Sequence, residues 1–129
     1  RATSLAQLGG PARTVGDKRR LHQVVMNLVT NAIRYSPGGA AVTVECGTLP
    51  ERDEVFLRVI DSGPGLSAED LERAFDRFYR GSAAAGTAGS GVGLAIAADL
   101  AAAHGGRLVA ANADPDGASF TLVLPATDM

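Results

Sequence analysis

Three polar side chains recur at helical spacing within one strongly apolar stretch. Asn27, Asn31 and Arg34 are four and three residues apart, so a helix would carry them along one side. Amide oxygens can coordinate a hard metal ion, and a planar guanidinium can donate hydrogen bonds to phosphate. On spacing alone, the polar flank of an ordinary surface helix is an equally good interpretation.

A second candidate site follows an apolar run of strand character. Asp61 ends that run, and Gly63 and Gly65 come directly after it. The carboxylate could accept a hydrogen bond from the exocyclic amine of a purine, and glycines let the backbone come close to a ligand. A plain strand-to-helix turn explains the same residues, because Asp, Gly and Pro all favour turns.

A third candidate is the glycine-rich start of an Ala-rich helix, made by Gly89, Gly91, Gly93 and Leu94. Free N–H groups and the helix dipole make such a start an anion site, so the pattern predicts phosphate binding. A Walker loop is excluded, because the sole lysine, Lys18, lies far from these glycines. A Rossmann fingerprint is disfavoured, since the segment follows a polar loop and has Leu94 where a third small residue belongs.

Arg77 and Arg80 alternate with aromatic residues in the run 75–80 (FDRFYR), at the entry to a long loop. The arginines could reach phosphate, whereas core packing is the better interpretation for Phe75 and Phe78. Residues 77–90 offer almost nothing to bury, and loops of about 14 residues are usually functional or disordered.

The hydrophobic pattern predicts the elements that must position these residues. Helices are expected over 17–35, 68–75 and 91–104, and strands over 41–46, 55–60, 107–111 and 119–124. About three helices on one face of a mixed, mostly antiparallel sheet would form a two-layer α/β sandwich, an α+β fold. The residues before Asp17 are expected to be weakly structured.

The first helix is expected to start at Asp17 as its N-cap. Its apolar side chains, predicted to share one buried face, are Leu21, Val24, Val25, Leu28, Val29, Ala32 and Ile33. His22 is expected at the surface of this helix. His104 closes the last helix, where a cationic side chain would suit the helix dipole.

Composition narrows the function classes. A chain of 129 residues allows one core, so a single domain over 1–129 is expected. The formal net charge of -2 removes the footprint of a nucleic-acid binder. Cys46 cannot form an internal disulfide, which fits a reducing cytoplasm. The longest apolar run, 92–103, is broken by Asp99 and shorter than the ~20 residues of a membrane span, so no transmembrane helix or signal peptide is expected.

In order and spacing, the four segments resemble the sequence boxes of bacterial sensor histidine kinases. Residues 27–37 (NLVTNAIRYSP) resemble the N box, 61–65 (DSGPG) the G1 box, 75–80 the F box and 89–94 (GSGVGL) the G2 box. The resemblance spans about 17–125. It implies the Bergerat-type ATP-binding fold of the gyrase, chaperone, histidine kinase and mismatch-repair ATPases, and a domain that binds ATP and Mg2+ to phosphorylate a histidine.

The resemblance also implies a role for each matching residue. Asn31 would bind Mg2+ through oxygen, with Asn27 in the same pocket. Arg34 would meet phosphate, Tyr35 would lie against adenine, and Asp61 would bind the adenine amino group. The implied catalytic residues are Asn31, Arg34, Arg77 and Arg80.

The glycines and the loop receive roles in the same way. Gly63 and Gly65 would let the backbone approach the base, and Arg77 and Arg80 match arginines near the polyphosphate. The loop 77–92 would form the ATP lid. The positions that match the lid hinge and helix start are Gly89, Gly91, Gly93 and Leu94.

Two features bear on the reaction. Gyrase- and chaperone-type ATPases carry a water-activating Glu where this chain has Asn27, and an amide is no general base, so slow hydrolysis is expected. The family's acceptor histidine lies in a dimerising helical hairpin, and neither His22 nor His104 has that context. The resemblance therefore implies a separate histidine-containing dimerisation domain and a downstream response regulator. It also implies a cytoplasmic domain of a parent protein that is a membrane-anchored homodimer.

Two other functions stay open on sequence. An anti-sigma-factor-type serine kinase shares the nucleotide pocket, but the run 75–80 is typical of sensor kinases. A nucleotide-binding regulator that transfers no phosphate would need the same pocket. A matching histidine hairpin separates a histidine kinase from a regulator, because only the kinase would label it.

Overall fold

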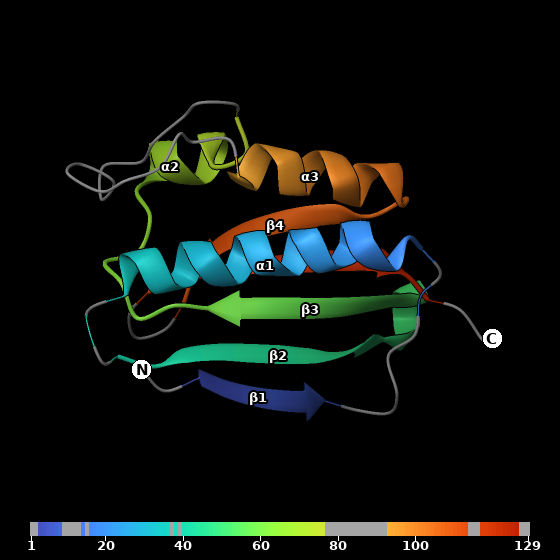
Figure 1. Cartoon of the computed structure of the whole chain (residues 1–129), viewed down its shortest axis with the longest axis horizontal. Coiled ribbons are helices and arrows are strands. Elements are labelled where there is room, and N and C mark those ends of the chain that lie inside the picture. Colours follow the sequence, from blue (N-terminus) through green and yellow to red (C-terminus); the bar gives the residue numbers. More distant parts are fainter. Residues whose placement is uncertain are drawn as a thin grey trace.

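The computed structural model describes residues 3–8, 14, 16–36, 38, 40–76, 93–113 and 117–126. A five-stranded sheet has the order β1-β2-β3-β5-β4, and the helices cover one of its faces (Figure 1). The strands are β1 (Thr3–Leu8), β2 (Val42–Leu49), β3 (Glu54–Ile60), β4 (Arg107–Asn112) and β5 (Ala118–Pro125). The α-helices are α1 (Lys18–Tyr35), α2 (Ala68–Arg73) and α3 (Gly93–Ala103). Among the described strands only β1 and β2 pair in parallel, so the predicted sandwich with a mixed, mostly antiparallel sheet is confirmed.

Strand β1 contradicts the expectation that the residues before Asp17 are weakly structured. Its register against β2 joins Thr3 to Val42 and Leu8 to Gly47. The segment TSLAQL includes Ala and Gln, which have little preference for strands, so it carries no strand pattern of its own. Pairing with β2 makes it an edge strand, and local sequence cannot show that long-range contact.

Helix α1 begins where the sequence predicts. The Asp17 carboxylate accepts hydrogen bonds from the backbone N–H groups of Arg19 (3.0 Å) and Arg20 (3.2 Å). The fully buried side chains are four residues apart: Val24, Leu28 and Ala32. Ile33 is 40% exposed, so the expected buried face was too wide. It lies five residues after Leu28, which turns it about 140° away around the helix.

His104 joins the end of α3 to the start of α1, a contact that the sequence did not predict. Its Nε2 accepts a hydrogen bond from the backbone N–H of Asp17 at 3.1 Å, and its Nδ1 donates to the Leu100 carbonyl at 2.8 Å. His104 thus lies at the end of α3, as expected, and links it to α1 across 87 positions of sequence. His22 is exposed, as expected.

Both expected hairpins are present. Strand β2 extends past the expected end at Cys46 to Leu49, because the turn is a tight 3₁₀ helix over Pro50–Arg52 followed by Asp53 at φ 54°. Strands β4 and β5 pair antiparallel beside β3. At this end of the sheet Arg107 forms an ion pair with Glu54, and its hydrogen bond lowers the pKa of that carboxyl.

The two shorter helices end close to the expected positions. Ser67 caps α2 through a reciprocal bond with Asp70, but the helix stops at Arg73. Phe75, just beyond it, packs edge-on against Phe120 with ring centroids 6.2 Å apart, which confirms its place in the core. Gly105 ends α3 with φ 77°, the left-handed conformation that glycine favours.

Candidate functional site

Asp61 lies where β3 ends, and it is 5% exposed. Its Oδ1 accepts hydrogen bonds from the backbone N–H groups of Gly63 and Ala118, each at 2.9 Å. Its own backbone N–H donates to the Ala118 carbonyl at 2.9 Å. One oxygen of this carboxylate is therefore fixed by the fold in a single orientation.

The other oxygen, Oδ2, has no hydrogen-bond partner among the described residues. Among the described residues, every fully buried side-chain oxygen has a hydrogen-bond partner. Because Oδ2 has none, it must be accessible to solvent. A carboxylate held through one oxygen and open at the other is a preorganised acceptor. This geometry suits a donor such as the amino group of a purine.

Glycines close to Asp61 are required by the fold itself. A Cβ at Gly63 would lie 2.5 Å from the Tyr35 carbonyl oxygen, and one at Gly117 would overlap the Asp61 carbonyl. Gly65 and Gly117 also have φ of 84° and 93°, where other residues are strained. The approach of Gly63 and Gly65 to a base stays a prediction. The structure adds a second reason for glycine at these positions, the close contact at Gly63 and the positive φ at Gly65, which the sequence did not reveal.

Two serines tie the loop 61–66 to α1 and β2. The backbone N–H of Ser62 donates to Ser36 Oγ at 3.0 Å, and Ser62 Oγ donates to the Ala41 carbonyl at 2.5 Å. Ser36 is buried directly after α1. Sequence reasoning used Ser36 only as part of a helix stop, although a small polar residue there was a signal for such a bond.

Asn27 connects the polar side of α1 to the start of α3. Its Nδ2 donates to the Gly93 carbonyl at 3.1 Å, across 66 positions of sequence. The N-box and G2-box segments, which the sequence treats separately, are thus neighbours. Because the amide nitrogen is engaged, the Asn27 oxygen is the atom left for a ligand.

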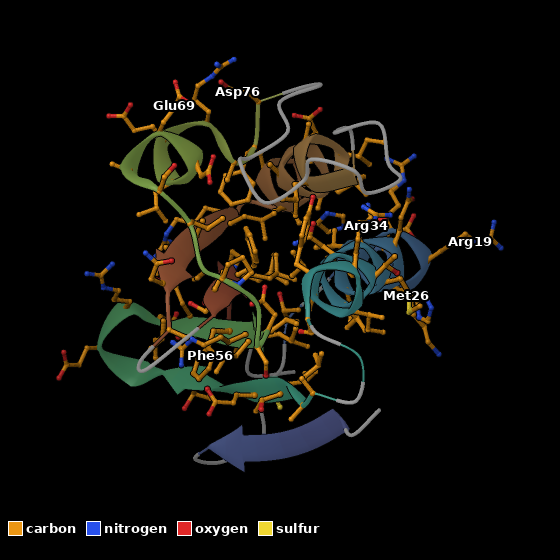
Figure 2. The ribbon with its side chains drawn as sticks, turned by 90° about the vertical axis from the view of Figure 1, so that its left-hand side faces the viewer. Arg19, Met26, Arg34, Phe56, Glu69 and Asp76 are labelled. Carbon is orange, nitrogen blue, oxygen red and sulfur yellow. The ribbon has the colours of Figure 1, made fainter. Side chains whose placement is uncertain are left out.

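Asn31, Arg34 and Tyr35 follow Asn27 on α1. Asn31 and Tyr35 are half-buried and Arg34 is exposed, and the described residues give the Asn31 and Arg34 side chains no hydrogen-bond partner. Figure 2 shows Arg34 on α1 beneath α3, whereas Met26 lies on the outer side of the same helix. The predicted helix over these residues is confirmed, so their spacing of four and three places Asn27, Asn31 and Arg34 along one side of α1.

The remaining predicted residues divide into two groups. Gly93 is the first residue of α3, and Leu94 packs against the core. Outside the described residues lies the whole predicted lid, 77–92, and with it Arg77, Phe78, Arg80, Gly89 and Gly91. Asn112, which sequence reasoning missed, binds the backbone of Leu66 from β4. Its only sequence signal was an Asn before turn-forming residues.

The side-chain chemistry restricts how a metal could bind. Within the described ranges, no three His, Cys, Asp or Glu side chains come together. An amide oxygen from α1 could serve as a hard oxygen ligand for a Mg2+ ion held mainly by phosphate and water. Among the helices that the structure describes, none is long and apolar enough to cross a membrane.

Comparison with known proteins agrees with this geometry. The family described as "Histidine kinase-, DNA gyrase B-, and HSP90-like ATPase" matches residues 16–128. The signal transduction histidine-protein kinase BaeS of Escherichia coli (strain K12) is 42% identical over 113 residues, covering 85% of this chain and 24% of BaeS. The chain thus spans about a quarter of the length of that relative.

Solved structures share the fold. The mycobacterial sensor histidine kinase MprB superposes with a TM-score of 0.87 at 32% identity, covering 98% of this chain and 86% of that one. Full-length ShkA in complex with AMPPNP gives a TM-score of 0.78 at 27% identity, covering 97% of this chain and 26% of ShkA. The chain therefore belongs to the histidine kinase-, DNA gyrase B- and HSP90-like ATPases, an ATP-binding family, and within it to the sensor histidine kinase catalytic domains.

Proposed function

We propose that residues 1–129 form a single catalytic domain that binds Mg-ATP and donates the γ-phosphoryl group to a histidine in a separate dimerisation domain. The observation that carries the proposal is the Asp61 carboxylate, fixed through Oδ1 and open at Oδ2. The AMPPNP complex of ShkA supports a nucleotide as the ligand.

The nucleotide would lie between α1, the loop 61–66 and the start of α3. Asp61 Oδ2 would accept the adenine amino proton, which selects adenine over a 6-oxo purine. Tyr35 would lie against the base, as the family resemblance implies, and its carbonyl oxygen lies beside Gly63. Arg34, exposed on the α3 side of α1, would meet phosphate as a planar donor.

Asn31 would hold Mg2+ through its amide oxygen, with the Asn27 oxygen in the same pocket. When bound, Mg2+ neutralises charge on the phosphate oxygens. The chain's own contribution is to orient the polyphosphate with Asn31, Arg34, Arg77 and Arg80, and to begin α3 at Gly93 beside it. Gly89, Gly91 and Leu94 would complete the lid hinge and helix start. Positioning and charge neutralisation account for most catalysis of phosphoryl transfer.

Water is a poor nucleophile at this site, because nothing in the polar stripe of α1 can take its proton. Asn27 occupies the position of the general base in related ATPases, and its amide nitrogen is bound to the Gly93 carbonyl. An imidazole from another domain needs no such base. The domain would therefore transfer phosphate to histidine faster than to water.

The partners follow from this reaction. A dimerisation domain of the same protein would supply the acceptor histidine, and a response regulator would take the phosphoryl group from it. We place the domain in the cytoplasm, as part of a membrane-anchored homodimer. The family resemblance to BaeS and MprB favours this reading over an anti-sigma-factor-type serine kinase or a regulator that transfers no phosphate.

Transfer to a histidine hairpin tests the proposal. The domain, fused to the dimerisation hairpin of a related sensor kinase, is incubated with Mg2+ and ATP labelled at the γ position. We expect acid-labile, base-stable label on the hairpin, as for phosphohistidine, and none on a hairpin whose acceptor His is replaced by Gln. Acid-stable label would instead indicate a serine kinase. Tight ATP binding with no label on any of several hairpins would indicate a regulator.

A further inference from the structure

Asn112, at the end of β4, binds both backbone polar groups of Leu66. Its Oδ1 accepts a hydrogen bond from the Leu66 N–H at 2.7 Å, and its Nδ2 donates to the Leu66 carbonyl at 2.9 Å. The side-chain amide therefore satisfies the loop as the backbone of a neighbouring strand would. Asn112 is itself exposed, so the contact belongs to the surface and not to the core.

Different residues hold the two ends of the loop 61–66. At the first end, the backbone and side chain of Asp61 bind Ala118. At the second end, Asn112 is the only hydrogen-bond partner of the Leu66 backbone within the described ranges. Leu66 also packs its side chain against the core, but the hydrogen bonding of this second end depends on one side chain from a distant strand.

The same side chain lies against the glycine that precedes Leu66. Gly65 has φ 84°, and a Cβ added there would lie 3.0 Å from Asn112 Oδ1. Gly65 and Gly63 are the backbone positions that approach the base in the proposed function. The Asn112 amide thus limits how far this backbone can move relative to Asp61.

We propose that Asn112 is a positioning residue for the adenine base, and this rests on the proposed nucleotide site. It fixes the glycine-containing loop at the distance from Asp61 that the base requires. Asn112 acts through Gly65 and Leu66 and needs no contact with the nucleotide. It adds β4 to a site whose other members come from α1, the end of β3 and the start of α3.

Replacing the Asn112 amide should lower the affinity for every adenine nucleotide by the same factor. Asn112→Ala removes both bonds to Leu66, and we expect the affinities for Mg-ATP and Mg-ADP each to fall roughly tenfold. The factors are equal because the γ-phosphate is far from the base. Asn112→Asp keeps an acceptor for the Leu66 N–H but turns a carboxylate oxygen toward the Leu66 carbonyl, acceptor against acceptor, so its affinity should also fall. Calorimetric titration measures all three proteins.

Arg107→Ala is the matched control, because Arg107 is an exposed residue of the same strand. It loses an ion pair to Glu54, with Nη1 and Oε2 2.7 Å apart, at the other end of β4. We expect unchanged nucleotide affinities. Thermal unfolding of each variant shows whether it is folded at the titration temperature. If Asn112→Ala is not, the isosteric Asn112→Asp decides the matter.

The outcomes separate this inference from the proposed function. A wild-type protein that binds no adenine nucleotide contradicts the nucleotide site itself. Wild-type binding with the same affinity in the folded Asn112 variants overturns only the positioning role. An equal loss in Arg107→Ala, or a loss for ATP much larger than for ADP, also overturns it, since neither follows from a displaced base.

Discussion

Asp61→Asn is expected to lower ATP affinity roughly 100-fold while the domain stays folded. The backbone N–H groups of Gly63 and Ala118 both point at Oδ1, so the new amide must place its oxygen there. Its NH2 group then takes the place of Oδ2 and faces the adenine amino group, donor against donor. Loss of a hydrogen bond to a charged group costs about 1.5–3 kcal/mol, and the opposed donors add to that cost.

The fixed orientation also predicts a change of base preference. An NH2 group in place of Oδ2 suits the carbonyl of a 6-oxo purine, so the preference for ATP over ITP should collapse in Asp61→Asn. Parallel titrations with both nucleotides measure this ratio, and thermal unfolding monitors the fold. Glu54→Gln, at the opposite end of β3, serves as the control and should leave the ratio unchanged. An Asp61→Asn protein that still prefers ATP as strongly as the wild type would contradict the site.

Asn31→Asp is expected to weaken Mg-ATP binding for a different reason, because its defect lies at the phosphates. The new carboxylate adds negative charge to a site that must hold a polyphosphate. Two unit charges about 4 Å apart interact by about 4 kcal/mol at an effective dielectric constant of about 20. Partial neutralisation by metal and by solvent leaves an expected loss of roughly 100-fold.

Adenosine separates this defect from that of Asp61→Asn. Asn31→Asp should bind adenosine as the wild type does, since the base contacts are intact, whereas Asp61→Asn should lose adenosine and ATP alike. Competition titrations against a fluorescent adenine nucleotide give both affinities. Thr30→Ser, on the exposed neighbouring position of α1, is a control that should change neither. Equal losses of adenosine and ATP in Asn31→Asp would place Asn31 away from the phosphates.

The local part of the fold and site could be predicted from the sequence. Asp17 caps α1, Ser67 caps α2 and Gly105 ends α3, because each signal involves residues within one helical turn. The four-three spacing that brings Asn27, Asn31 and Arg34 to one side of α1 is likewise local. Such features follow from helix geometry whatever the tertiary structure.

The contacts that assemble the site were not predictable, because they join distant segments. Asn112 reaches Leu66 across 46 positions and Asp61 reaches Ala118 across 57. The same holds for β1, which needs β2 as a partner, and for His104, which accepts a hydrogen bond from the Asp17 N–H. The prediction that Ile33 is buried was wrong for a geometric reason. The seven apolar side chains expected to share one face are spread more widely around the helix than one buried face.

Calorimetric titration with ATP, ADP and GTP, with and without Mg2+, tests the central claim most directly when hydrolysis is followed in the same samples. The account predicts adenine-selective binding strengthened for ATP by Mg2+, with negligible turnover, because Asp61 selects the base, Asn31 holds the metal and Asn27 cannot activate water. Binding that does not distinguish ATP from GTP, or brisk hydrolysis by the isolated domain, would contradict it.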